Sequence, residues 1–293
     1  MDMSSIEHRR VPCGEVQLDC ALAGSPDRPL VVLLHGFPES WYSWRHQIAA
    51  LAPEFYVAAP SLRGYGASDR PPEVSAYRLP RLVEDVRGLI RGLGRERACV
   101  VAHDWGGGIA WAFAIDHPEA TEKLAVLNCP HPTAFARALR SNPRQLLRSW
   151  YMFFFQLPRL PEWMLSRGDF RALDRGFRGW VKRKDREVFS DADLDTIKDS
   201  LRPLGAATAA INYYRAAFRF RADAERYASA PPIERPTLLI WAEEDAALGK
   251  ELTYGMEPLF RGPFSIRYIP DCSHWVQQEQ PELVNQHLLD FLR

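Results

Sequence analysis

The stretch Ala-Cys-Val-Val-Ala-His-Asp-Trp-Gly-Gly, residues 98–107, decides the fold. Its first five residues form a continuous apolar run, typical of a strand that is covered on both faces. Glycines follow Asp104 and Trp105, and residues 107–116 then have a helical pattern that ends before His117-Pro118. The sequence therefore predicts a strand, a sharp turn and a helix, with Asp104 in the turn.

Similar apolar runs recur along the chain at 30–34, 124–127 and 237–241, and helical patterns occupy 44–51 and 82–93. Strands that alternate with helices predict an open, mostly parallel sheet flanked by helices, which is the α/β class. In such sheets the functional groups gather beyond the carboxyl ends of the strands.

The alternation stops near Pro130-His131-Pro132 and resumes at Pro231-Pro232. We therefore predict a core in two parts, 1–133 and 229–293, separated by an inserted helical lid at 134–228. The insertion contains a helical pattern at 206–218 and the aromatic run Trp-Tyr-Met-Phe-Phe-Phe at 150–155. Most members of that run are expected to serve as packing surface.

Asp104 occupies the place that serine takes in a G-x-S-x-G nucleophile elbow. An aspartate before a helix is often only an N-cap. The catalytic interpretation is favoured because an acid and a histidine follow in the chain order nucleophile, acid, histidine. The acid is Asp245, with Glu243 and Glu244 as competitors, and the histidine is His274, which follows a predicted strand at 265–269.

The glycine-bearing turn His35-Gly36-Phe37-Pro38 follows the first apolar run. We expect the backbone N–H groups of Phe37 and Trp105 to point at one oxygen of the Asp104 carboxyl group as an oxyanion hole. His35 is assigned no chemical role.

Composition bounds the remaining choices. The 37 basic and 37 acidic residues leave no net charge to attract nucleic acid or an anionic membrane surface. Five scattered cysteines without a C-x-x-C pair predict reduced thiols rather than disulfides or a zinc site. The polar N-terminus and the lack of a long apolar run predict a cytoplasmic protein without membrane insertion. Whether the protein is a monomer or a homodimer stays open.

Seven motifs together resemble the epoxide hydrolases of the α/β-hydrolase fold, and they cover almost the whole chain: HGFPES, SLRGYGASDRP, HDWGGG, NCPHP, SWYMFFFQLP, NYYRA and DCSHW. The resemblance implies Asp104 as nucleophile and Asp245 with His274 as the pair that activates water. It also implies Phe37 and Trp105 as oxyanion donors, and two lid tyrosines, Tyr151 and Tyr214, as acids. Tyr213 is an alternative to Tyr214, and the resemblance selects Tyr214.

The chemistry explains the aspartate. A serine that attacked an epoxide carbon would form a stable ether, whereas a carboxylate forms an ester that water can hydrolyse. The expected partners are an apolar epoxide and water, and this reaction requires no metal, nucleotide or redox cofactor.

Two rival functions stay open. Haloalkane and haloacetate dehalogenases use the same aspartate, but the former place asparagine where Phe37 stands, and the latter place arginine close after the nucleophile. Arg63 is an alternative anion-binding residue for the haloacetate reaction. A small-molecule receptor that retains the fold is the third hypothesis.

Overall fold

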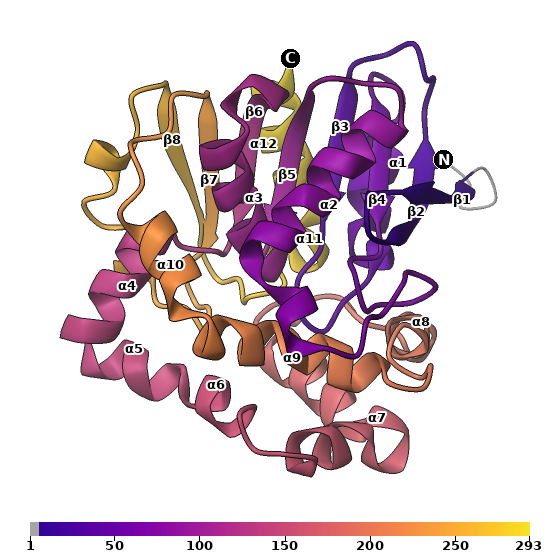
Figure 1. Ribbon diagram of the computed structural model, residues 1–293, viewed down its shortest axis with the longest axis vertical. Helices are drawn as coiled ribbons and strands as arrows, with labels where there is room; N and C mark the ends of the chain where they lie inside the picture. The colour runs from indigo at the N-terminus through magenta and orange to yellow at the C-terminus, as the bar shows by residue number, and fades with distance from the viewer. Residues whose placement is uncertain (1–5) are drawn as a thin grey trace.

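The computed structural model describes residues 6–293, which form an eight-stranded sheet and the helices around it (Figure 1). The strand order is β1-β2-β4-β3-β5-β6-β7-β8, and all neighbours from β4 to β8 are parallel, while β1 and β2 pair antiparallel at one edge. The strands are β1 (Glu7–Pro12), β2 (Gln17–Ala23), β3 (Leu30–Leu34), β4 (Tyr56–Pro60), β5 (Ala98–His103), β6 (Thr121–Leu127), β7 (Thr237–Ala242) and β8 (Phe264–Ile269).

Helices cover both faces of this sheet, so strands β3, β4, β5 and β7 are buried along their whole length. Ile48 of α1 and Leu288 of α12 belong to the hydrophobic cluster on one face, and Leu89 of α2 and Trp111 of α3 belong to the cluster on the other. These helices are α1 (Arg45–Leu51), α2 (Leu79–Gly92), α3 (Trp105–Asp116), α11 (Val276–Glu279) and α12 (Pro281–Leu292). The prediction of a mostly parallel sheet flanked by helices is confirmed.

Between β6 and β7 the chain forms helices only. They lie along one end of the sheet, below it in the view of Figure 1. These helices are α4 (Pro132–Ser141), α5 (Pro143–Arg148), α6 (Trp150–Phe154), α7 (Leu160–Trp180), α8 (Asp191–Asp199), α9 (Ala206–Arg219) and α10 (Arg221–Ala228). The backbone leaves the helical conformation at 167–170 inside α7. The division of the chain into domains at 134 and 228 stays a prediction.

Short 3-10 helices occupy Trp41–Trp44, Val74–Tyr77, Pro118–Ala120, Lys250–Thr253 and Glu257–Leu259. Within residues 6–293, no helix combines the length and the apolar character required to cross a bilayer.

Candidate active site

Asp104 lies in the turn between β5 and α3, where its backbone has φ 50° and ψ −120°. A positive φ is unfavourable for a residue with a side chain and is typical of functional positions. The turn depends on the two glycines that follow. A Cβ on Gly106 would lie 2.3 Å from the Leu34 carbonyl oxygen, and one on Gly107 would lie 2.5 Å from Cβ of Cys129. The small residues are therefore required for the close approach of α3 to the sheet.

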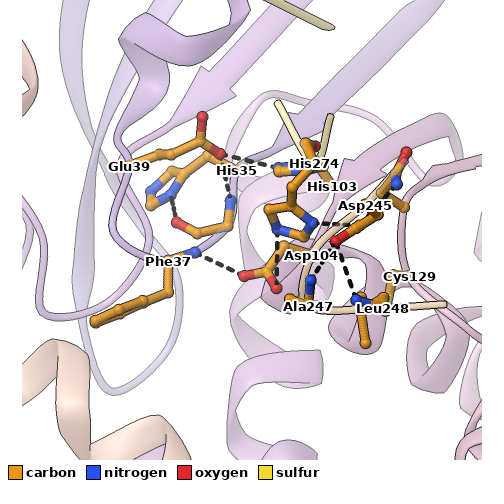
Figure 2. Close-up of polar contacts among 12 residues, drawn as sticks. His35, Phe37, Glu39, His103, Asp104, Cys129, Asp245, Ala247, Leu248 and His274 are labelled. Atoms are coloured by element: carbon orange, nitrogen blue, oxygen red, sulfur yellow. Dashed lines mark hydrogen bonds and ion pairs between the residues drawn. The ribbon is translucent and has the colours of Figure 1, made fainter. Parts of the chain in front are cut away.

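The Asp104 carboxyl group does not cap α3, although the residue stands at the N-cap position. Its Oδ1 accepts a hydrogen bond of 2.8 Å from the backbone N–H of Phe37, and its Oδ2 lies 3.6 Å from Nε2 of His274 (Figure 2). Capping therefore does not explain the aspartate. Trp105 begins α3, and the first helical bond runs from the N–H of Gly108 to the Asp104 carbonyl at 3.0 Å.

His274 is held between two carboxyl groups. Its Nδ1 lies 2.6 Å from Oδ2 of Asp245, which leaves Nε2 directed toward Asp104 (Figure 2). The other oxygen of Asp245 accepts hydrogen bonds from the backbone N–H groups of Ala247 at 2.8 Å and Leu248 at 3.0 Å. These bonds fix the orientation of Asp245 and, through it, that of the imidazole.

The two competitors of Asp245 point elsewhere. Glu243 pairs with Lys250, and Glu244 lies 3.3 Å from Lys182. Of the three acidic residues that the sequence offered, Asp245 is the one that the structure brings to His274.

Charge follows this geometry. Burial acts to raise the pKa of Asp104, but the hydrogen bond and positive charge of His274 outweigh it and keep the pKa below its usual value. The pKa of Asp245 is lowered against the same effect of burial by the charge of His274. Burial alone would lower the pKa of His274, yet the charge of Asp245 and the contact with Asp104 raise it. These mutual shifts favour a protonated imidazole between two carboxylates in the resting site.

A cavity of about 520 Å³ opens on Asp104, and most of the side chains that line it are apolar. Trp105, Tyr151 and Tyr214 also line it. The Tyr214 ring meets those of Trp105 and Tyr151 edge to face, with centroids 5.0 and 5.8 Å apart. Burial, followed by the charge of Asp104, raises the pKa of both tyrosines, so both phenols are protonated at neutral pH.

The neighbouring Tyr213 faces away from this cavity. Its hydroxyl donates a hydrogen bond of 2.7 Å to the backbone carbonyl of Arg63. Each nitrogen of the buried Arg63 guanidinium donates a hydrogen bond, two of them to the oxygens of Asp85 at 2.6 and 2.8 Å and one to the carbonyl of Ala76 at 2.8 Å. Arg63 is therefore not available to hold an anionic substrate.

His35 serves the loop itself. Its Nδ1 lies 2.8 Å from the carbonyl of Gly36, and its Nε2 accepts from the N–H of Leu62 at 2.9 Å. These contacts give His35 a structural role in the turn.

Three further residues of the site were missed by the sequence reasoning. Asn128 donates a hydrogen bond of 2.8 Å to Oδ2 of Asp245, the oxygen that contacts His274. Near Asp104, Glu39 and His103 are completely buried, with Oε2 of Glu39 2.9 Å from Nδ1 of His103. All three stand in the motifs HGFPES, HDWGGG and NCPHP.

Among residues 6–293, no group of three or more His, Cys, Asp or Glu side chains is arranged to hold a metal ion. The polar groups of the site contact one another or face the cavity.

Comparison with known proteins adds sequence and structural relatives. A family model described as the alpha/beta hydrolase fold matches residues 29–281. Epoxide hydrolase 1 of Caenorhabditis elegans is 39% identical over 98% of this chain and 70% of its own length. The AB hydrolase superfamily protein YfhM of Bacillus subtilis is 38% identical over 99% of both chains. The crystal structure of a Bacillus megaterium epoxide hydrolase in complex with an inhibitor superposes with a TM-score of 0.85 at 31% identity, covering 98% of this chain and 99% of the other.

Proposed function

The chain belongs to the epoxide hydrolases of the α/β-hydrolase fold, and we propose that it converts an apolar epoxide to a vicinal diol through a covalent ester on Asp104. One observation carries this mechanism. The Asp104 carboxylate is ionised, makes no capping bond and faces an apolar cavity that two protonated tyrosines also line.

In the first step an oxygen of Asp104 attacks one carbon of the epoxide, and the bond between that carbon and the ring oxygen breaks. The ring oxygen becomes an alkoxide and takes a proton from Tyr151 or Tyr214. The raised pKa of the two phenols makes them weaker acids than free tyrosine, but this pKa falls as the reaction proceeds. The charge of Asp104 is one cause of the raised pKa, and that charge disappears when the ester forms.

The same loss of charge prepares His274 for the second step. In the resting site the two carboxylates raise the pKa of the imidazole. A protonated imidazole cannot act as a base. Esterification of Asp104 removes one of them, so the pKa of His274 falls and its proton replaces the one that the phenol gave away.

Neutral His274 then takes a proton from water, and the hydroxide attacks the carbonyl carbon of the Asp104 ester. The N–H groups of Phe37 and Trp105 are proposed to stabilise the tetrahedral oxyanion, with the bond from Phe37 to Oδ1 already present at 2.8 Å. The intermediate collapses, His274 protonates the departing diol oxygen, and the proton of the new Asp104 acid returns to His274.

The helical insertion is proposed to act as the lid that carries the two phenols. Both lie on insertion helices, Tyr151 on α6 and Tyr214 on α9. The cavity lining supports an apolar substrate body.

Product analysis tests the proposal against its rivals. Purified protein is incubated separately with styrene oxide, chloroacetate and an aryl ester, with the Asp104→Ala variant as control. We expect diol from the epoxide and no diol from the variant. Halide release without diol would favour a dehalogenase, and release of phenol alone would favour an esterase. No product from any of the three would favour a small-molecule receptor.

A further inference from the structure

The insertion exposes large apolar side chains in a regular stripe. They recur every three or four residues along the chain from α5 through α6 into α7, and Leu146 and Met164 beside them are exposed as well. We call this set the exposed stripe, and it consists of Leu147, Trp150, Phe153, Leu157, Leu160 and Trp163. Leu147 is 74% exposed, and the two tryptophans are 62% and 55% exposed.

Most of the aromatic run 150–155 packs against the core, as expected, but Trp150 and Phe153 do not. Helix α6 contains no buried residue at all. Helices α5, α6 and the start of α7 follow one another along the outer side of the insertion, away from the sheet (Figure 1). Exposed apolar patches of this kind mark surfaces that meet a partner or a membrane.

Charge identifies the partner. Residues 134–228 contain 19 Lys and Arg against 11 Asp and Glu, a net charge of +8, so the remainder of the chain carries −8. The expectation that charge attracts no anionic surface was drawn from the chain as a whole, in which these two charges cancel. Between 137 and 167 there are six arginines and one acid, Glu162. Glu162 is neutralised inside the insertion, where it accepts two hydrogen bonds from Arg215 at 2.6 and 3.2 Å.

Several of these arginines have no carboxylate of their own. Among residues 6–293, Arg144 and Arg159 form no ion pair, and Arg167 lies over the ring of Trp163 at 5.1 Å. A second copy of this chain that met the exposed stripe with its own stripe would bring arginines against arginines. A surface of phosphate groups over hydrocarbon would instead match both the charges and the apolar side chains.

We propose that the exposed stripe docks on the surface of a bilayer that contains anionic phospholipid. The tryptophans and leucines enter the interface, and the flanking arginines contact the headgroup phosphates. This docking is peripheral and concerns helices that lie along the membrane plane.

The position of the stripe gives the docking a purpose. Phe153 belongs to the stripe and also lines the cavity that reaches Asp104. Its neighbour Met152 lines the same cavity but is not part of the stripe. An apolar molecule dissolved in the bilayer therefore has a route into the cavity beside the docked face. This consequence rests on the proposed function, whereas the docking itself does not.

Vesicle sedimentation tests the docking directly. The full chain is mixed with vesicles of phosphatidylglycerol and phosphatidylcholine in equal parts, and separately with phosphatidylcholine alone. We expect binding to the anionic vesicles that is at least tenfold stronger than to the neutral ones and that weakens as salt is added. The double variant Leu147→Ser plus Trp163→Ser should lower the affinity at least tenfold. Leu204→Ser is the matched control because Leu204 is 98% exposed but lies outside the stripe.

A charge variant separates the two contributions. Arg144→Glu plus Arg159→Glu should abolish the preference for anionic vesicles, while Arg91→Glu, an exposed change on α2 of the core, should leave it intact. Diol formation from a water-soluble epoxide reports whether these variants keep their site. Absent binding to anionic vesicles, or binding that the stripe variant leaves unchanged, overturns the proposal. A dimer in light scattering that the stripe variant dissociates also overturns it, because the stripe would then be a contact between copies.

Discussion

Nδ1 of His103 lies 2.9 Å from Oε2 of Glu39, and neither side chain reaches solvent. This pair connects the two loops that form the site. Nε2 of His103 lies 2.9 Å from the backbone carbonyl of His274, and Oε2 of Glu39 accepts from the N–H of Gly36 at 3.3 Å. The other oxygen of Glu39 accepts from Gln278 at 2.7 Å. One buried carboxyl group therefore anchors the loop of His274 and the loop of Phe37 together.

We expect Glu39→Gln to lower the free energy of unfolding by about 2–4 kcal/mol. Both oxygens of Glu39 accept hydrogen bonds, and the amide NH₂ group that replaces one of them would face a donor. Urea unfolding measures the change. Glu84→Gln is the matched control, since Glu84 meets His117 at the same distance of 2.9 Å but on the surface. Equal stability of the two variants would show that the buried pair does not anchor the loops.

Asp104→Ala and Asp104→Ser should both abolish diol formation while the protein stays folded. Neither replacement can form an alkyl ester that water hydrolyses. Diol analysis by chromatography and circular dichroism of the same samples check the two parts. Appreciable turnover by the serine variant would contradict the covalent route through Asp104.

The positions of the central strands could be predicted because parallel strands that are buried on both faces have continuously apolar sequences. The runs at 30–34, 98–102, 124–127 and 237–241 all lie inside strands. Strand β1 was not predicted, since its sequence Glu-His-Arg-Arg-Val-Pro is that of an exposed edge. Such a strand is defined by its pairing with β2 rather than by burial.

Some residues of the site could likewise be predicted from the sequence, and others could not. Asp104, Asp245 and His274 follow strands whose ends were predicted, so their meeting could be inferred from the chain order. The partners of Glu39 could not, because Gln277 and Gln278 lie more than two hundred residues away and carry no periodic signal. Long-range polar contacts of this kind depend on packing that no local pattern encodes.

His274→Gln should leave ester formation largely intact and block its hydrolysis. The enzyme then accumulates with the mass of protein plus substrate, which intact-mass spectrometry detects. Asp245→Asn should show the same defect more mildly, because the imidazole keeps its contact with Asp104 but loses its orienting charge. If an epoxide that the wild type hydrolyses leaves no adduct on the glutamine variant, then His274 is required before the ester forms.

The pKa of His274 should fall in Asp104→Ala. The carboxylate of Asp104 stabilises the protonated imidazole, so its removal favours the neutral form and the imidazole loses its proton at lower pH. A ¹⁵N NMR titration of the imidazole measures the shift. His131, whose pKa burial lowers to about 4, is the internal control that should not move. An unchanged titration of His274 would remove the argument that esterification prepares the base.

The lid phenols allow a comparison between neighbours in sequence. Tyr214 lines the cavity, whereas the Tyr213 hydroxyl donates a hydrogen bond of 2.7 Å to the backbone carbonyl of Arg63. Adjacent positions on α9 point about 100° apart, so the same loss of one hydroxyl can be placed inside or outside the cavity. Tyr213→Phe should therefore affect stability through the lost hydrogen bond and leave the rate of alkylation nearly unchanged.

Tyr151→Phe and Tyr214→Phe should each slow alkylation by an epoxide roughly tenfold or more, the usual scale of general acid catalysis, and the double change should nearly abolish it. The reason is that the alkoxide from the opening ring is strongly basic, and His274 is reserved for water. Phenylalanine keeps the edge-to-face packing of the two rings, whose centroids are 5.8 Å apart, so folding should be unaffected. Rapid-mixing measurements of the first turnover follow the step directly. A double variant that alkylates at the wild-type rate would exclude the phenols as acids and favour halide displacement, because a halide leaves without a proton.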